Sequence, residues 1–228
     1  MQGMLLIDKP ATWTSFDVVN YVRRMVATAE GKKPKNIKVG HTGTLDPLAT
    51  GLLVVLVGKE YTRRAMEWSK LDKTYEVTMK LGETSTTGDE EGEKTPGSGR
   101  EPDVSEIKAV LEQFTGNLMQ TPPVYSAMKV GGVRAYKLAR EGKEVVLEPR
   151  PATIHSNVLA EYEYPYVRFT SSVSSGTYIR SLVQDMGGAL GTGAYMSDLR
   201  RTLVGSFDIA DAVDVDGLQI DSLPLRYL

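Results

Sequence analysis

Residues 39–53 read Val-Gly-His-Thr-Gly-Thr-Leu-Asp-Pro-Leu-Ala-Thr-Gly-Leu-Leu, the densest run of glycine and hydrogen-bonding side chains in the chain. This run separates two apolar segments. Pro47 fixes its own φ and restricts Asp46 to extended conformations. The stretch is therefore either a loop that holds the Asp46 carboxylate rigidly at the end of a sheet, or an ordinary Asp-Pro turn in which Asp46 bonds nearby backbone.

Apolar patterns on both sides of this loop predict the elements around it. Leu52 to Val57 reads as a buried strand, and Met4 to Ile7 as a short strand. Ser15 is placed to cap a helix whose apolar residues follow at helical spacing: Val18, Val19, Val22, Met25 and Val26. Further patterns predict strands over 74–81, 152–173 and 195–207, and helices over 60–69, 103–114, 134–141 and 179–190. This irregular alternation favours a mixed α/β (α+β) fold with a largely antiparallel central sheet flanked by helices.

The composition excludes several classes of site. The chain has 228 residues and no cysteine, which rules out disulfides, thiolate nucleophiles and cysteine-ligated metals. Two histidines, His41 and His155, leave little for a histidine-rich metal site, so we expect no metal. No apolar run reaches the roughly 18 residues that span a bilayer, and Asp8 and Pro10 come too early for a signal peptide. We therefore expect a cytoplasmic protein without a membrane partner.

The formal net charge of −2 hides a segregation of charge along the chain. Residues 21–40 carry six basic side chains against one acidic, a net +5, and residues 121–150 carry a net +3. Residues 83–106 carry a net −6, and residues 207–222 a net −5. Basic segments that meet in space grip phosphates even in an acidic chain, whereas separate ones are ordinary solvated surface.

Three further segments carry candidate functional residues. Arg180 lies in the first turn of a predicted helix, where the helix dipole disfavours a cation. It either pairs with a buried carboxylate such as Asp46 or lies in solvent. Tyr75 on the 74–81 strand either contacts a planar ligand, moves a proton, or packs in the core. Residues 122–140 interleave basic and aromatic side chains, as nucleic-acid contact surfaces do.

Together and in this order, these segments resemble the TruB family of pseudouridine synthases, which make pseudouridine-55 in the T-loop of tRNA. The stretch Gly-His-Thr-Gly-Thr-Leu-Asp-Pro-Leu-Ala-Thr-Gly at 40–51 is highly specific for this family and its guide-RNA-dependent relatives. Matching stretches run from Leu-Ile-Asp-Lys-Pro at 6–10 to Leu-Arg-Arg-Thr at 199–202. Tyr-Ser-Ala-Met-Lys at 125–129 is similar to the stand-alone bacterial branch. Two motif positions differ. Thr12 stands where the family usually has glycine, and Val173-Ser174-Ser175 stands where the family often has Cys-Ser-Lys or similar.

The resemblance implies a role for each matching residue. Asp46 matches the essential aspartate, the nucleophile. Tyr75 matches the tyrosine that packs against the target base, and Arg180 the arginine paired with the catalytic carboxylate. The remaining matches are expected to bind the substrate: His41 beside the flipped-base pocket, Tyr178, Leu199, and the motif lysines Lys9 and Lys129.

The resemblance also implies the organisation and the activity of the chain. Residues 1–228 are expected to form one catalytic domain, with 121–151 as an inserted thumb-like segment that grips RNA. Relatives usually continue into a small C-terminal PUA-like domain, which we expect to be absent because the chain stops after an acidic tail. The expected reaction, carried out by a monomer on the T-arm of tRNA, flips uridine 55 and uses Asp46 to cleave and re-form its glycosidic bond. It is expected to need no cofactor. An RNA chaperone on the same scaffold and a guide-RNA-dependent synthase are the alternatives.

Overall fold

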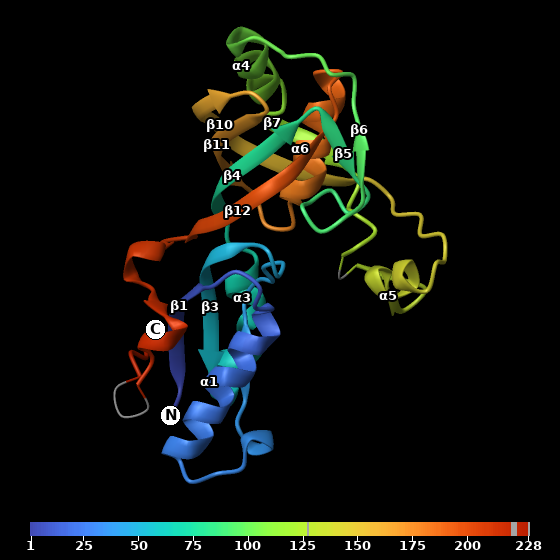
Figure 1. Cartoon of the computed structure of the whole chain (residues 1–228). Helices are drawn as coiled ribbons and strands as arrows, with labels where there is room; N and C mark the ends of the chain where they lie inside the picture. Colours follow the sequence, from blue (N-terminus) through green and yellow to red (C-terminus); the bar gives the residue numbers. More distant parts are fainter. Residues whose placement is uncertain (127, 220–222, 228) are drawn as a thin grey trace. The chain divides into compact units, whose positions relative to one another are not determined.

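The computed structural model describes residues 1–126, 128–219 and 223–227, and it divides into two compact units (Figure 1). Unit 1 comprises Met1–Tyr75 and Leu199–Leu228, and unit 2 comprises Glu76–Asp198. The chain passes between them within two strands, β4 (Lys73–Leu81) and β12 (Ala194–Val204). Two positions discussed above lie outside the described residues: Ala127 of the 125–129 stretch and Asp221 of the acidic tail.

Unit 1 is built on strands in the order β14–β1–β3–β12. The antiparallel pairs are β1 with β3, β2 with β3, and β12 with β13, whereas β14 joins β1 and β12 joins β3 in parallel. Their bounds are β1 (Gly3–Lys9), β2 (Val39–His41), β3 (Thr50–Val57), β13 (Phe207–Asp208) and β14 (Val213–Asp214). Short 3₁₀ turns lie at η1 (Pro34–Asn36), η2 (Ile209–Asp211) and η3 (Val215–Gly217).

Both faces of β1 and β3 are buried, which explains why their sequences are continuously apolar. The helix α1 (Ser15–Ala29) packs on the odd-numbered residues of both strands (Figure 1). On the opposite face, Tyr61 and Trp68 pack on the even-numbered residues. They come from α2 (Lys59–Arg63) and α3 (Ala65–Ser69), so the single helix predicted over 60–69 is in fact two short ones that meet at Arg64.

The N-terminus of α1 differs from the prediction in its capping residue. Thr14, and not Ser15, is the N-cap: it accepts from the Asp17 amide, and the Asp17 side chain bonds back to Thr14. This reciprocal arrangement is a capping box. Ser15 is the first helical residue and is buried, so its hydroxyl is free to bond a different segment of the chain.

Unit 2 contains the neighbouring strands β4–β11–β10–β7 with two helices. The pairs β10–β11 and β10–β7 are antiparallel. The elements are α4 (Val104–Gln113), β7 (Gly116–Gln120), β10 (Arg150–Glu163), β11 (Tyr166–Val173) and α6 (Ile179–Ala189). Asp103 and Glu106 form the predicted capping box of α4. The mixed fold with a largely antiparallel sheet and flanking helices is confirmed.

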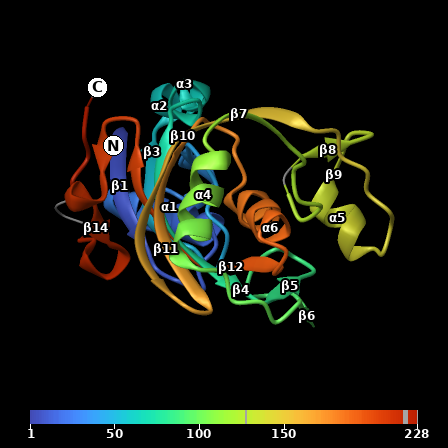
Figure 2. The ribbon, with the colours of Figure 1, turned by 90° about the horizontal axis from the view of Figure 1, so that it is seen from above.

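Two hairpins leave the sheet of unit 2. The pair β5 (Glu83–Ser85) and β6 (Lys94–Pro96) encloses the acidic turn region. The segment after β7 carries β8 (Lys129–Val130), β9 (Val133–Arg134) and α5 (Ala135–Arg140), and it projects from the rest of unit 2 in both views (Figures 1 and 2). The predicted short helix over 134–141 therefore lies within an excursion of the chain.

Candidate active site

The loop between β2 and β3 holds Asp46 on a fixed backbone. The amide of Ala49 donates to the Asp46 carbonyl over 3.1 Å, which closes a turn around the aspartate. The Ser15 hydroxyl donates to the Leu45 carbonyl (3.0 Å) and accepts from the Leu45 amide (2.8 Å). Leu45 is buried and Asp46 only partly so. Leu45 therefore anchors the backbone next to Asp46 to α1.

Arg201 clasps both ends of the same loop. Its guanidinium donates to the Leu52 carbonyl over 2.7 Å and to the Gly43 carbonyl over 3.1 Å, and the side chain is 1% exposed. The backbones approach closely at this point, since a Cβ on Gly51 would lie 2.3 Å from the Arg201 carbonyl. Gly51 also has φ +99°, which only glycine adopts without strain. A glycine at position 51 is therefore a requirement of the packing.

Pro47, the residue after Asp46, receives two further hydrogen bonds from the turn that follows β1. The Thr12 amide donates to the Pro47 carbonyl over 2.8 Å. Lys9 is fully buried, and its ammonium donates to the carbonyls of Pro10 (2.8 Å), Trp13 (2.7 Å) and Pro47 (3.3 Å). Backbone carbonyls thus engage three Lys9 N–H donors, and Lys9 holds the loop in place. The contact of Lys9 with substrate stays a prediction.

The cations around the loop are buried, and burial disfavours their charge. Burial lowers the pKa of Lys9 to about 8, although the nearby Asp46 carboxylate opposes the change. Burial, and secondly the charge of Arg201, lower the pKa of Lys73 to about 8. Lys73 donates to the carbonyls of Ser69 and Leu71. The Lys9 ammonium therefore places a positive charge near the Asp46 carboxylate.

His41 ends β2 at the start of the loop. Burial, and secondly the charge of Arg201, lower the pKa of His41 below its usual 6.5, so the imidazole is neutral at pH 7. Its Nδ1 atom is buried and has no hydrogen-bond partner within the part of the chain that the structure describes. A neutral imidazole with one uncommitted nitrogen is suited to a hydrogen bond with a polar ligand.

In unit 2, Arg180 lies in the first turn of α6 and is 6% exposed. It donates to the carbonyls of Thr87 (3.1 Å) and Tyr125 (2.9 Å), and it lies 3.5 Å from the buried carboxylate of Asp89. These contacts offset the unfavourable helix dipole and exclude the solvent-exposed alternative. Because Asp46 belongs to unit 1, the pairing of Arg180 with Asp46 stays a prediction.

Tyr178 is the N-cap residue of α6 and is fixed through its backbone. Its amide donates to the Gln120 side chain over 2.8 Å, and the same side chain donates to the Tyr178 carbonyl over 3.0 Å. Tyr75 on β4 and Leu199 on β12 are buried in unit 1, with 8% and 6% exposure. Their burial fits core packing and an apolar pocket wall equally, so their contact with a base stays a prediction.

Lys129 lies in the projecting segment, far along the sequence from the elements that hold Asp46. It is exposed on β8, and Arg134 is its direct partner on β9. Two cations opposite one another on a hairpin repel and destabilise it. Tyr136 lies nearby, with the Arg140 guanidinium 5.7 Å from its ring centre. The segment thus presents exposed basic groups near the partly buried Tyr136, and its contact with nucleic acid stays a prediction.

A cavity of about 690 Å³ opens beside Arg200, the residue that precedes Arg201 on β12. Lys9, Trp13, Thr50 and Arg200 line it together with residues 214–217. Arg200 binds both carboxylate oxygens of Asp8, at 3.0 and 2.5 Å, and both side chains are partly exposed. Successive residues of a strand point to opposite faces, so Arg200 faces this cavity while Arg201 faces the loop.

Sequence reasoning missed two residues that hold the candidate site. Asp89 was one of eight acidic residues in a polar turn, with nothing to distinguish it from its neighbours. Arg201 follows Arg200, and a pair of adjacent arginines gives no sign that one is buried. The period-2 alternation of the strand was the available signal, because Leu199 and Arg201 share a face.

Within residues 1–126, 128–219 and 223–227, no helix is long and apolar enough to cross a membrane. The same residues contain no group of three or more histidine, aspartate or glutamate side chains that could hold a metal ion.

Chains in two solved structures have the same fold as this chain. The chain superposes on a protein in a Cbf5-Nop10-Gar1 complex with a TM-score of 0.71 and 30% identity, over 96% of this chain and 54% of that chain. A structure titled as an H/ACA RNP bound to a substrate RNA containing 2′-deoxyuridine matches with a TM-score of 0.68 and 28% identity, over 96% and 52%. The chain thus spans about half the length of these solved chains. The fold is that of a pseudouridine synthase.

Sequence comparison narrows this class to one family. Residues 29–179 match the model of the TruB family pseudouridylate synthase N-terminal domain, and residues 180–223 match the tRNA pseudouridylate synthase B C-terminal domain. A tRNA pseudouridine synthase B of Opitutus terrae is 42% identical over 99% of this chain and 89% of its own length. One of Burkholderia lata is 42% identical over 96% and 65%. The chain belongs to the TruB family of pseudouridine synthases.

Proposed function

We propose that this chain isomerises uridine 55 in the T-loop of tRNA to pseudouridine, with Asp46 as the catalytic carboxylate. The observation that carries the proposal is the fixed Asp46 loop, which Ser15, Arg201 and Lys9 bind from three different segments. An ordinary Asp-Pro turn needs no side chains from other segments to hold it in place. The relatives named tRNA pseudouridine synthase B supply the substrate class.

The reaction needs only a carboxylate and a pocket. The bond between C1′ and N1 breaks, the uracil turns, and C1′ rejoins the base at C5, whose proton is finally lost while N1 gains one. Three routes use the same Asp46 carboxylate: capture of C1′, capture of C6, or proton removal to a glycal-like intermediate. Arg180 is proposed to pair with the carboxylate and keep it ionised. The isomerisation balances without an external oxidant or reductant.

The base must leave its stack to reach Asp46, at a cost of a few kcal/mol. Tyr75, Tyr178 and Leu199 are proposed to form the apolar surface against which the flipped uracil packs and which keeps water from the intermediate. His41, neutral and with Nδ1 uncommitted, is proposed to bind beside this pocket. Together these contacts offset the cost of flipping.

The projecting segment 121–151 is proposed to grip the T-arm. The opposed cations Lys129 and Arg134 repel in the free protein, and phosphates between them remove that repulsion. Residues 1–228 supply the catalytic part in this proposal, and the protein works in the cytoplasm as a monomer.

The test is pseudouridine mapping of a tRNA transcript and of a T-arm hairpin after incubation with the purified chain. We expect pseudouridine at position 55 in both, none with Asp46→Asn, and retained tRNA binding by that variant. The matched control is Asp216→Asn, which removes an exposed carboxylate and leaves turnover unchanged. Normal turnover by Asp46→Asn contradicts the proposed chemistry.

Two other outcomes identify the alternatives. Refolding of tRNA by the wild-type chain without any pseudouridine identifies an RNA chaperone. Pseudouridine formation that requires an added guide RNA identifies a guide-dependent synthase. Because the hairpin assay contains no guide, turnover there excludes the second of these.

A further inference from the structure

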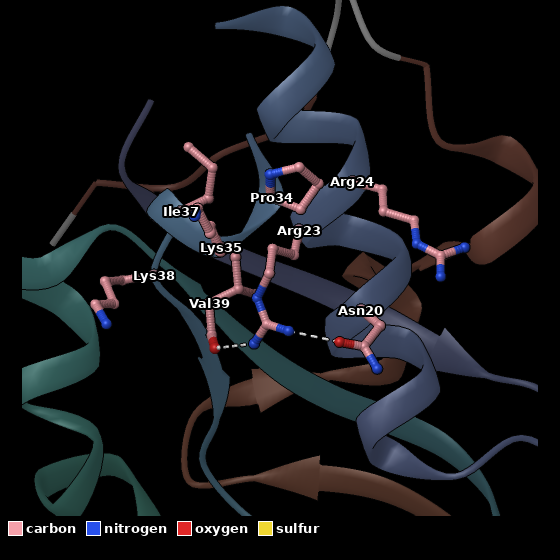
Figure 3. Close-up of a pocket in the computed structure, with 8 residues that line it drawn as sticks. All are labelled: Asn20, Arg23, Arg24, Pro34, Lys35, Ile37, Lys38 and Val39. Atoms are coloured by element: carbon pink, nitrogen blue, oxygen red, sulfur yellow. Dashed lines mark hydrogen bonds between the residues drawn. The ribbon is translucent and has the colours of Figure 1, made fainter. Parts of the chain in front are cut away.

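A basic cavity in unit 1 takes no part in the proposed reaction. It encloses about 600 Å³ between α1 and the start of β2. Figure 3 shows the eight residues that line it: Asn20, Arg23, Arg24, Pro34, Lys35, Ile37, Lys38 and Val39. Four of these are cationic and none is acidic. The basic cavity is therefore a concentrated positive charge on a chain whose net charge is −2.

Three of the four cations are uncommitted. Arg24, Lys35 and Lys38 are exposed, and within the described ranges none of them makes an ion pair. In Figure 3, Arg24 and Lys38 lie on opposite sides of the cavity and their charged ends point apart. Cations that are spread across a surface fit a row of anionic groups better than one small anion, on which side chains would converge.

The fourth cation, Arg23, is fixed in the middle of the basic cavity. Its guanidinium donates to the Asn20 side chain and to the Val39 carbonyl over 3.2 Å (Figure 3). This bridge joins α1 to β2. Arg23 therefore has a structural role as well as a charge, and the three exposed cations are the ones that are free to bind a ligand.

An exposed aromatic ring extends the basic cavity along α1. Phe16 is 60% exposed, and the Arg23 guanidinium lies 5.8 Å from its ring centre. Phe16, Asn20 and Arg23 share one face of the helix, because they are four and then three residues apart. An exposed ring beside arginine is suited to stacking with an unpaired base, a contact worth more to single-stranded RNA than to duplex.

We propose that Phe16 and the basic cavity form a second RNA-binding site, which stacks one base and binds the phosphates that follow it. The inference rests on the proposed function, since it takes the ligand to be the tRNA substrate. Ser15 bonds Leu45 beside Asp46, and Arg23 follows eight residues later, about 12 Å along the helix. At about 3.4 Å per stacked nucleotide this is three to four nucleotides, so one RNA strand reaches both places.

The first experiment measures tRNA binding as a function of salt for Arg24→Ala/Lys35→Ala/Lys38→Ala. Loss of three phosphate contacts lowers the slope of log K against log salt by about 2 to 3 and weakens binding. The charge-matched control is Lys70→Ala/Lys108→Ala/Arg168→Ala, which removes three exposed cations elsewhere. A slope and an affinity equal to those of the control overturn the proposal. Loss of pyrophosphate binding with unchanged tRNA binding also overturns it, because the site then takes a small anion.

The second experiment tests the stacking contact at Phe16. We expect Phe16→Ala to weaken tRNA binding by about 5- to 100-fold and Phe16→Tyr to restore it, because stacking requires a ring and not its apolarity alone. Equal affinity of Phe16→Ala and the wild-type chain contradicts this part of the proposal.

The third experiment locates the RNA directly. The chain has no cysteine, so Asn36→Cys introduces a unique attachment point for an iron chelate that cleaves nearby RNA. Cleavage of tRNA from residue 36, and none from a Lys108→Cys control, supports the proposal. No cleavage from residue 36 while the chain is bound and active overturns it.

Failure of this inference is distinguishable from failure of the proposed function. A wild-type chain that makes no pseudouridine refutes the function, whereas the binding and cleavage comparisons still read out the second site. A wild-type chain that is active, with a basic-cavity variant indistinguishable from its control, refutes the second site alone. A wild-type chain that binds no tRNA refutes both.

Discussion

The amide of Thr12 donates a 2.8 Å hydrogen bond to the carbonyl of Pro47, and Thr12 makes it from a left-handed backbone conformation with φ 71°. Within the described residues it is the one non-glycine position with positive φ. This conformation costs a residue with a Cβ about 1–2 kcal/mol. The strain is located in the turn that holds the loop around Asp46.

Replacement of Thr12 by glycine is therefore expected to stabilise the protein. Relief of strain outweighs the extra entropy of glycine in the unfolded chain, and the free energy of unfolding rises by about 0.5–1 kcal/mol. Urea denaturation measures the change. The control is Ala11→Gly, where no strain is relieved and stability falls or stays the same. A loss of stability in Thr12→Gly as large as in the control would show that the turn stores no strain.

Arg201→Met is expected to loosen the Asp46 loop, since the carbonyls of Gly43 and Leu52 lose their buried donor. We expect a loss of about 2–4 kcal/mol in unfolding free energy. The matched control is Arg200→Met. Its partly exposed pair with Asp8 is screened by solvent, and its removal costs about 1 kcal/mol or less. Equal losses of unfolding free energy for the two variants, measured by urea denaturation, would contradict the role of Arg201 in holding the two ends of the loop.

The Arg201→Met protein that remains folded tests, separately from stability, whether Arg201 positions Asp46. Single-turnover pseudouridine formation at saturating tRNA is expected to slow, because Asp46 is no longer held in one place. Arg200→Met keeps the wild-type rate. A wild-type rate for folded Arg201→Met would assign Arg201 to stability alone.

His41 gives the protein a defined response to acid. Burial, and secondly Arg201, lower its pKa in the folded chain below the 6.5 of an unfolded chain. Between those two values the unfolded chain binds more protons, so the contribution is fully present above pH 6.5 and is lost as the pH falls. In His155→Gln the remaining imidazole NMR signal is that of His41, and we expect it to titrate below 6.5. Titration at or above 6.5 would contradict the effect of burial.

The same linkage predicts the stability of a His41 variant. His41→Gln has no titrating side chain at this position, so its free energy of unfolding falls less than that of the wild-type chain between pH 6.5 and pH 5. Parallel urea denaturation at the two pH values measures the difference. Identical losses in the two proteins would show that His41 has the same pKa folded and unfolded.

Neutralising Lys129, Arg134 and Lys137 together is expected to weaken tRNA binding and to lower the salt slope by about 2 to 3. The same substitutions remove the repulsion between Lys129 and Arg134, so the free protein is not destabilised. The control is again Lys70→Ala/Lys108→Ala/Arg168→Ala. A tRNA affinity and a salt slope equal to those of this control would refute the proposal that segment 121–151 binds the T-arm.

The sequence allowed most of the elements to be predicted, because single-segment patterns determine them. The alternation along β4 and the capping box at Asp103 each lie within a few residues. The prediction failed at the start of α1, where Thr14 and Ser15 are both good caps and tertiary structure decides. Ser15 is drawn to Leu45, and Thr14 caps the helix instead.

The residues of the candidate site could be predicted from the sequence, but the contacts that hold them in place could not. The specific stretch at 40–51 pointed to Asp46, whereas the partners that fix it come from distant segments. Arg201 is 158 residues from Gly43, and Arg180 is 93 residues from Thr87. Strand alternation places Arg201 on the same face as Leu199, but it does not identify the carbonyls that Arg201 binds, because only the folded chain brings them together.

Unit 1 is assembled from both ends of the chain, and unit 2 from one continuous segment. On the ribosome, unit 2 is therefore complete while unit 1 still lacks the part of β12 from Leu199 on, together with β13 and β14. The loop that carries Asp46 emerges early, yet Arg201, which clasps it, is added 158 residues after Gly43. A nascent chain thus gains the full set of contacts around the Asp46 loop only after all of unit 2 has been made.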